Sequence, residues 1–229
     1  MIELSDVRFR WHRDAPLVLD IPAFEVRAGE RVFLEGPSGS GKTTLLNILG
    51  GVTVPETGRV TVNGVHLGEL SGAGRDRFRA DHIGFVFQMF NLISYLSPMD
   101  NVILPCRFSQ RRKAAAQQRS ESVKNEAQRL LRHMNLDANM VAARPASAFS
   151  IGQQQRIAVS RALIGAPPLV IADEPTSALD HAVRTTFMDL MFEEVTATDA
   201  ALLFVSHDPS LGTQFDRQVT LADINGATA

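Results

Sequence analysis

The chain has 229 residues, of which 45% are hydrophobic, and its 23 basic and 25 acidic residues leave a formal net charge of −2. This length suits one large α/β domain or two small ones with a sizeable core, and the near balance of charge excludes an overall field that would attract nucleic acid or an acidic membrane surface. No leader pattern opens the sequence and no apolar run is long enough to span a bilayer, so we expect a cytoplasmic, soluble chain that can still dock on a membrane protein.

The first 35 residues predict short strands separated by turn signals. The expected strands are Ile2–Arg10, Leu17–Ile21, Phe24–Val26 and Arg31–Leu34, with turns at 14–16, at Pro22 and at 28–30. This pattern favours an N-terminal antiparallel β subdomain. Trp11 follows the first strand, where its ring could stack on an adenine. A partly buried aromatic at a sheet edge is an equally good interpretation of Trp11.

A glycine-rich loop comes next. Its residues are Gly36, Pro37, Ser38, Gly39, Ser40, Gly41, Lys42, Thr43 and Thr44. They match the phosphate-binding pattern G-x-x-x-x-G-K-[ST] at every fixed position, between a predicted strand and a predicted helix at Leu45–Leu49. The glycines let successive N–H groups face an anion, the helix adds its positive N-terminal end, and Lys42 adds a mobile charge. The loop therefore predicts a nucleoside triphosphate site.

Two more strands are expected before the middle of the chain. The first is at Gly58–Gly64 with a turn at its end, and the second, Ile83–Gln88, is apolar up to its last residue. Strand ends in α/β sheets open into the ligand crevice, so Gln88 is a candidate ligand contact. Simple capping of a turn is the alternative interpretation of this glutamine.

From 89 to 144 the strand pattern stops, and 111–136 has a helical period. One apolar stripe contains Val123, Ala127, Leu130, Leu131 and Met134. Basic residues cover the opposite side, namely Arg111, Arg112, Lys113, Arg119, Lys124, Arg129 and Arg132. A solvated helix face is favoured over a partner surface for these charges. We expect a helical insertion here, in which the only cysteine, Cys106, is a small buried hydrophobic residue that fits a reducing compartment.

A long helix is expected after Phe149, and it stops at the Gly-Ala-Pro-Pro run of 165–168. Ser150 and Gly152 at its start can present a hydroxyl and bare N–H groups to an anion. Taken alone, this segment is only a well-capped helix.

Acidic and imidazole side chains follow two further apolar strands. The strand that begins at Leu169 ends in Asp173 and Glu174, which places these acids at the carboxyl edge of the sheet, beside the glycine loop. Mg²⁺ prefers oxygen ligands, here the Thr43 hydroxyl and Asp173, and Glu174 is the candidate general base. The strand 201–205 leads to His207, which could hydrogen-bond a γ-phosphate or orient the attacking water.

In this order, the motifs resemble the nucleotide-binding subunit of ATP-binding cassette (ABC) transporters along essentially the whole chain. The resemblance implies the Walker A loop at 36–43, the Q-loop at Gln88, the signature motif at Ser150, Gly152 and Gln153, Walker B at Asp173 and Glu174, the D-loop ending at Asp180, and the switch histidine at His207. It implies ATP contacts from Trp11, from the loop as far as Thr44, and from Ser150, Gly152, Gln153 and Asp180. It also implies Mg²⁺ ligands at Thr43, Gln88 and Asp173, and catalytic roles for Glu174, His207 and Gln88.

The segments 87–92, 100–105 and 144–145 resemble the LolD, MacB and FtsE branch of this family. One departure concerns the signature, usually L-S-G-G-Q, which is Phe-Ser-Ile-Gly-Gln here. Ile151 replaces a glycine, so the backbone at this position cannot need a positive φ without strain. The departure bears on the ATPase rate and on the tightness of dimer closure.

The resemblance implies an α/β fold with a P-loop (RecA-like) core, an N-terminal antiparallel β subdomain and an inserted α-helical subdomain. The core is expected at 1–88 and 165–229, and the helical subdomain at about 89–164. It implies an ATPase with ATP and Mg²⁺, a head-to-tail homodimer on ATP binding, and an integral-membrane permease partner at the cytoplasmic face of the inner membrane, without nucleic acid. The implied function is to power lipoprotein-release or macrolide-export transport. The alternatives are an FtsE-like mechanotransmission ATPase without cargo and a soluble non-transport ATPase.

Overall fold

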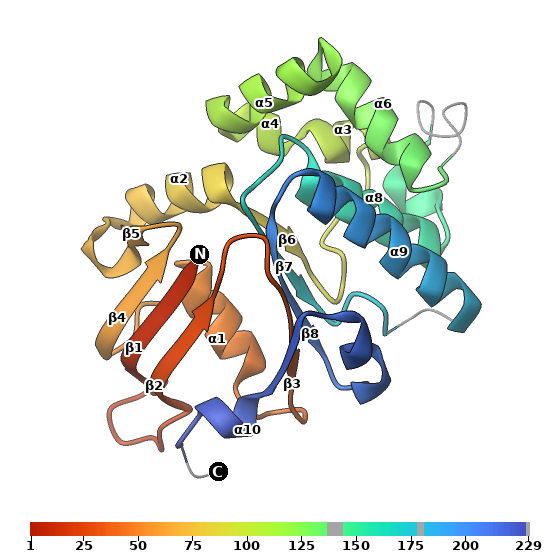
Figure 1. The fold of residues 1–229 in the computed structure, drawn as a ribbon. Coiled ribbons are helices and arrows are strands. Elements are labelled where there is room, and N and C mark those ends of the chain that lie inside the picture. Colours follow the sequence, from red (N-terminus) through yellow and green to blue (C-terminus); the bar gives the residue numbers. More distant parts are fainter. Residues whose placement is uncertain (137–143, 178–180, 228–229) are drawn as a thin grey trace. The chain divides into compact units, whose positions relative to one another are not determined.

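The computed structural model describes residues 1–136, 144–177 and 181–227 (Figure 1). The chain forms two compact units. The first unit consists of Met1–Arg79 and Ala201–Ala229, and the second unit of Ala80–Ala200. Among the helices of the described ranges, none combines the length and the apolar character needed to cross a membrane.

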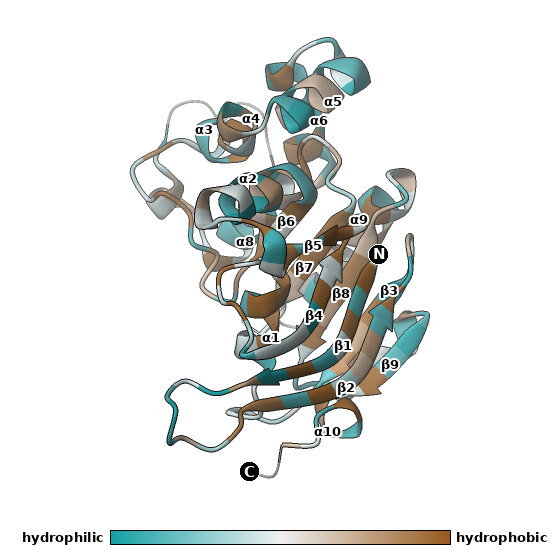
Figure 2. Cartoon of the chain, turned by 90° about the vertical axis from the view of Figure 1, so that its left-hand side faces the viewer, coloured by the Kyte–Doolittle hydropathy of each residue, from teal (hydrophilic) through white to brown (hydrophobic). Residues whose placement is uncertain are grey.

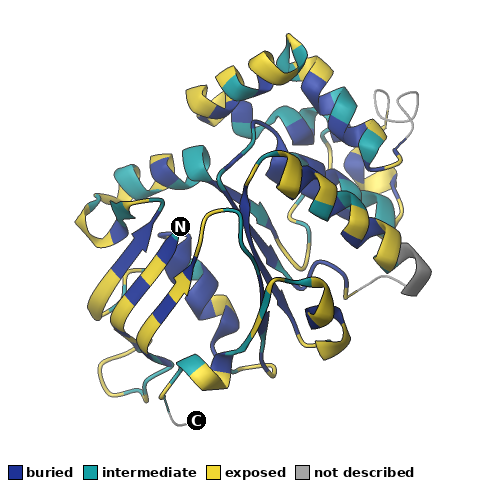
Figure 3. Ribbon diagram, viewed as in Figure 1, coloured by how far each residue is buried: buried dark blue, intermediate teal, exposed yellow. Residues whose placement is uncertain are grey.

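The first unit contains an antiparallel sheet with the strand order β2-β1-β4-β5. Its strands are β1 (Ile2–Phe9), β2 (Leu19–Val26), β4 (Thr57–Val62) and β5 (Val65–His66). Buried and exposed residues alternate along much of β1 and β2, as expected for a sheet with one covered face (Figure 3). The expected N-terminal antiparallel subdomain is therefore confirmed.

One prediction within this sheet is wrong, because Pro22 does not end a strand and β2 runs through it. The strand β2 is at the edge of the sheet, where the missing N–H of a proline breaks no ladder on the open side. Towards β1, Pro22 stands level with Asp6, between the paired residues Ser5↔Ala23 and Val7↔Ile21. Asp6 has a left-handed φ of 51°, so the irregularity of β1 and the proline coincide.

The first unit also contains three parallel strands. They are β8 (Ala201–Ser206), β3 (Arg31–Glu35) and β9 (Arg217–Thr220), with β3 in the middle. The expectation that Arg31–Leu34 belongs to the antiparallel group is therefore wrong. Val32, Phe33 and Leu34 are all fully buried, which is typical of a central parallel strand covered on both faces. Figure 2 shows the same continuous hydrophobic character along β8.

Helices connect these strands. The first unit contains α1 (Lys42–Leu49), η1 (Leu67–Glu69), η3 (Pro209–Gln214) and α10 (Leu221–Ile224), and α2 (Gly72–His82) leads into the second unit. The helix α1 follows β3 after the glycine loop and buries its leucines and Ile48 in the core. The strand, loop and helix context expected for the loop is therefore present.

The second unit is mainly helical, around one parallel pair of strands. The pair is β6 (Ile83–Val86) and β7 (Leu169–Asp173). The helices are α3 (Pro98–Ile103), α4 (Pro105–Phe108), α5 (Gln110–Ser120), α6 (Val123–His133), η2 (Ala146–Ala148), α8 (Ile151–Leu163) and α9 (His181–Ala197). The helix α8 packs on β6 and on α3.

The single helix expected at 111–136 is two helices, α5 and α6. Glu121 has a left-handed φ of 61°, and the Ser122 side chain accepts a hydrogen bond from Asn125 N at 3.0 Å, so one helix ends and the next is capped here. The predicted apolar stripe lies on α6, where all its residues except Val123 are buried. Cys106 is buried as expected, and burial raises the pKa of its thiol.

The interpretation of the basic residues as a solvated face is wrong for Arg112. Its side chain is buried and donates hydrogen bonds to backbone carbonyls, including Ile164 O at 2.7 Å and Arg161 O at 3.3 Å. Burial lowers the pKa of Arg112 to about 10, so the guanidinium stays charged at neutral pH. The carbonyls at the end of α8 lack intrahelical partners, and Arg112 satisfies them.

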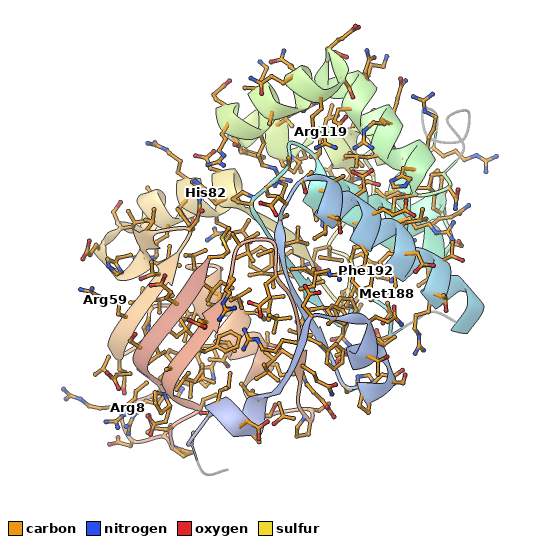
Figure 4. The ribbon with its side chains drawn as sticks, viewed as in Figure 1. Arg8, Arg59, His82, Arg119, Met188 and Phe192 are labelled. Carbon is orange, nitrogen blue, oxygen red and sulfur yellow. The ribbon has the colours of Figure 1, made fainter. Side chains whose placement is uncertain are left out.

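Arg129 is a second exception, because it joins α6 to α9 through two buried carboxylates. It donates to Glu126 Oε1 at 2.9 Å and to Glu194 Oε1 at 2.6 Å, and these side chains are only 2% and 4% exposed. Arg119, labelled in Figure 4, lies 3.4 Å from Glu126 Oε1. Burial alone would raise the pKa of Glu194. The hydrogen bonds and charges of Arg129 and His133 together lower the pKa by more than burial raises it, so the net shift is downward.

We predict that Arg129→Met lowers the free energy of unfolding by about 2 kcal/mol at pH 7. The two buried carboxylates lose the cation that they share, while Glu126 keeps Arg119 and Glu194 keeps His133, and Arg129 itself is partly exposed. A lowered carboxyl pKa stabilises the fold above the ordinary value of 4.5, and this contribution is lost as the pH falls below it. Urea unfolding at pH 7 and pH 3.5 measures both effects. Arg132→Met, on the exposed side of α6, is the control, and an equal loss in both variants would contradict the assignment.

Candidate nucleotide-binding site

The backbone of the glycine loop requires glycine at two positions. Gly39 has a φ of 83° and Gly41 has a φ of 103°, both in the left-handed region. A Cβ at Gly41 would also lie 3.1 Å from Leu19 Cδ2 and 3.2 Å from Val18 O, whereas nothing lies within 4 Å of a Cβ at Gly39. Gly41 is the N-cap of α1, so this geometry directs the chain into the helix.

Polar groups of the loop are arranged for an anion. The Lys42 ammonium is buried and donates to the carbonyls of Gly36 and Pro37, the latter at 3.0 Å. No described side chain caps the N-terminus of α1, and the buried Ser40 hydroxyl has no hydrogen-bond partner in the described part of the chain. Free N–H groups, an orphan hydroxyl and an ammonium together fit a phosphate group.

Trp11 and His207 belong to the same unit as the loop. Trp11 is 55% exposed and makes a T-shaped contact with Phe9, with ring centroids 4.9 Å apart. His207 follows the end of β8. Because Glu35 pairs with Ser206 in the parallel β3 and β8, the glycine loop and His207 leave the same edge of this pair.

The second unit brings Gln88, Asp173 and Glu174 to one edge in the same way. Val86 pairs with Ala172 in the parallel strands β6 and β7, and the three polar residues follow directly. Glu174 is buried and has a left-handed φ of 48°, and Ser177 donates to its backbone carbonyl from both N (3.3 Å) and Oγ (3.1 Å). Asp173 is half-buried and Gln88 is exposed.

Ser150 is the N-cap of α8 and forms a capping box with Gln153. Its Oγ accepts from Gln153 N at 3.4 Å, and its own N–H donates to Gln153 Oε1 at 3.0 Å. Ile151 takes the first helical position, so its backbone needs no positive φ, as expected. Its side chain is 58% exposed. Gly152 is half-buried on the same turn, and Asp180 lies outside the described residues.

Two residues near this site carry no sequence signal of their own. Arg161 lies on α8 and donates to the carbonyls of Phe90 and Asn91, just after Gln88. Asn101 is fully buried in α3 and binds the backbone of the same loop. Their partners are distant backbone groups, which sequence spacing does not reveal.

Comparison with known proteins places these features in one family. The model of the ABC transporter family matches residues 19–177. The chain is 38% identical to the lipoprotein-releasing system ATP-binding protein LolD of Chromohalobacter salexigens, over 93% of this chain and 87% of the relative. It is 37% identical to the macrolide export ATP-binding/permease protein MacB of Chromobacterium violaceum, over 97% of this chain and 33% of the relative.

Solved structures agree with this comparison. The dimeric post-hydrolysis structure of the ATP-binding cassette MJ0796, bound to ADP and Pi, has a TM-score of 0.84 to this chain, with 32% identity over 96% of this chain and 94% of that one. A protein named MJ0796 from Methanocaldococcus jannaschii is 36% identical over 97% of this chain. The α/β P-loop fold expected from the sequence is thus confirmed.

We predict that Gly41→Ala weakens ATP binding at least tenfold, because the alanine adds a contact with Leu19 and Val18 to the cost of about 1–2 kcal/mol for a left-handed residue. Gly39→Ala is the matched control, since it carries only the conformational cost in open space. Isothermal titration with ATP and with ADP measures the affinities. Equal losses in the two variants would show that the space around Gly41 does not matter.

Proposed function

Because this chain belongs to the ABC transporter family, in the LolD and MacB branch of its ATPases, we propose that it powers an inner-membrane transporter of the lipoprotein-release or macrolide-export kind. The match to a LolD protein over 93% of this chain and 87% of the relative carries this proposal. The glycine loop, with its uncapped helix and buried Lys42, supplies the matching chemistry.

We assign nucleotide binding first to the glycine loop and Trp11. The loop Gly36–Thr44 binds the phosphates of ATP, and Lys42 exchanges its carbonyl partners for phosphate oxygens. Trp11 offers its exposed face to the adenine ring. Thr43, Gln88 and Asp173 would hold Mg²⁺, which would neutralise charge on the phosphate oxygens.

Hydrolysis needs a base and a group that orients water. Glu174 takes the proton of the attacking water. The left-handed backbone of Glu174 and the Ser177 hydrogen bonds to its carbonyl hold the main chain from which this carboxylate extends. His207, at the end of β8, holds the γ-phosphate or the water in line. Gln88 completes the set from the end of β6.

The site is completed by a second copy of the chain. Ser150, Gly152, Gln153 and Asp180 of one copy contact the ATP bound by the other, which places ATP between two chains and favours the closed dimer. The exposed position of Ser150 at the start of α8 supports this role. The cassette MJ0796, at 32% identity, is dimeric with ADP and Pi.

The membrane partner is an integral permease, and the chain associates peripherally with the cytoplasmic face of the inner membrane. The C. violaceum relative is named an ATP-binding/permease protein, and this chain corresponds to 33% of it. The helical segment of about 89–164 makes the contact. Within this segment we assign the contact to the loop 87–97, where the exposed apolar side chains of Met89 (81%) and Tyr95 (78%) follow Gln88.

We predict that Glu174→Gln lowers ATP turnover at least about 100-fold, because it removes the general base. ATP binding persists, so the variant should accumulate as a stable ATP-bound dimer of the protein. Size-exclusion chromatography with light scattering measures this dimer. Glu3→Gln, at an exposed position of β1, is the control. Unchanged turnover in Glu174→Gln would refute the assignment of the base.

We predict that the Met89→Ser, Tyr95→Ser double variant loses co-purification with an integral permease from detergent-solubilised membranes, while its basal ATPase stays within about twofold of the unaltered chain. Phe108→Ser is the control, since Phe108 is 73% exposed on α4 and lies outside this loop. Recovery of the unaltered chain only from the cytosol, with no permease, would favour the soluble non-transport function. A permease recovered without any transported cargo would favour mechanotransmission.

A further inference from the structure

The turn that contains Gln88 has an unfavourable backbone. Phe90 N donates to Phe87 O at 2.9 Å and closes the turn around Gln88, and Asn91 N donates to Met89 O at 2.6 Å. Phe90 and Asn91 have φ values of 58° and 48°, so two successive residues with side chains are left-handed. A turn of this kind persists only when other contacts hold it.

Arg161 of α8 supplies such a contact. Its Nη2 donates to Phe90 O and its Nη1 to Asn91 O, each at 2.6 Å. Burial lowers the pKa of Arg161 below its ordinary value, and the charge is favoured by its position in the last turn of α8. The planar guanidinium bridges two adjacent carbonyls at once, which a lysine ammonium does not reproduce.

The far end of the same loop is tied to the segment that leads into Ser150. Ala146 N donates to Leu96 O at 2.8 Å, and Ser147 N donates to Ser94 O at 3.1 Å. Both donors belong to η2, which ends two residues before Ser150. The loop 87–97 is therefore bonded near both ends of α8.

Asn101 makes the loop itself stiff. Its side chain is fully buried, accepts from Ile93 N at 2.9 Å, and donates to Ile93 O at 3.0 Å and to Ser97 O at 3.2 Å. Asn101 lies on α3, which packs against α8 (Figure 1). The loop, η2 and α8 thus share one hydrogen-bonded network.

From these contacts we infer that Arg161 is a positioning residue, which fastens the loop 87–97 to α8 so that displacement of the loop displaces Ser150. The inference rests on the proposed function, in which this loop contacts the permease and Ser150 contacts ATP in the other copy. Arg161 acts through Gln88 and Ser150. A displacement of Met89 or Tyr95 is then transmitted to the start of α8 through the hydrogen bonds between the loop and η2.

The first test measures the network without nucleotide. Arg161→Met is compared with Ser160→Ala, which removes a hydrogen bond to Arg156 O on the same helix and none to the loop. We expect amide hydrogen exchange of Ala146 and Ser147 to accelerate at least tenfold in Arg161→Met only. Tyr95 is the only tyrosine, so 3-fluorotyrosine gives one ¹⁹F resonance on the loop, and this resonance should broaden or split.

The second test measures turnover. In Arg161→Met, kcat for ATP should fall at least tenfold while the KM stays within twofold, since the phosphate loop lies in the first unit. Arg161→Lys, which keeps the charge, should restore part of this activity, so that its kcat lies about threefold below that of the unaltered chain. If Arg161→Met does not fold, both the exchange and the turnover measurements are made on Arg161→Lys.

Unchanged exchange at Ala146 and Ser147 in Arg161→Met, or exchange equal to that in Ser160→Ala, would overturn the coupling. A uniform acceleration across the second unit would also overturn it, because that marks loss of global stability. The exchange and fluorine measurements need no catalysis. An unaltered chain without ATPase activity would therefore refute the proposed function while the coupling is still decided.

Discussion

Backbone groups at helix ends must find partners, and the two helices of the candidate site meet this constraint in opposite ways. The first N–H groups of α1 have no cap from any described side chain, and the Ser40 hydroxyl beside them is buried without a partner among the described residues. The start of α8 is closed by Ser150 and Gln153, and its end by Arg112. An uncapped helix keeps its donors for an anion, whereas a helix capped at both ends has its terminal backbone groups satisfied within the chain.

Parallel pairing then decides which residues meet. In each unit, two parallel strands end at matched register, Glu35 with Ser206 and Val86 with Ala172. The polar residues that follow each pair therefore leave from one edge. This explains why residues far apart in sequence, such as Gln88 and Glu174, follow strands that end at the same edge, while the strands themselves remain apolar and buried.

Local chemistry made much of this predictable. The glycine loop, the capped start of α8 and the apolar strands before Asp173 and His207 follow from neighbouring residues, and each is present. The errors concern long-range contacts. The direction of β3 depends on its partners β8 and β9, and the burial of Arg112 depends on carbonyls of α8. The contacts of Arg161 are not predictable for the same reason, since its partners lie in a different loop and its neighbours in sequence indicate only a helix.

Ile151 shows how geometry limits what an unusual residue can change. A glycine at the first position of α8 is not required, because the backbone there is helical and Ser150 already provides the cap. A β-branched residue also loses less conformational entropy on folding than glycine does, so the first turn of α8 gains order. The isoleucine side chain therefore affects mainly the surface of the chain. It is 58% exposed and lies next to Ser150, the serine assigned to the second copy's nucleotide. Under the proposed function, a substitution at Ile151 is therefore expected to change the fit between two copies and to leave the fold of one copy unchanged.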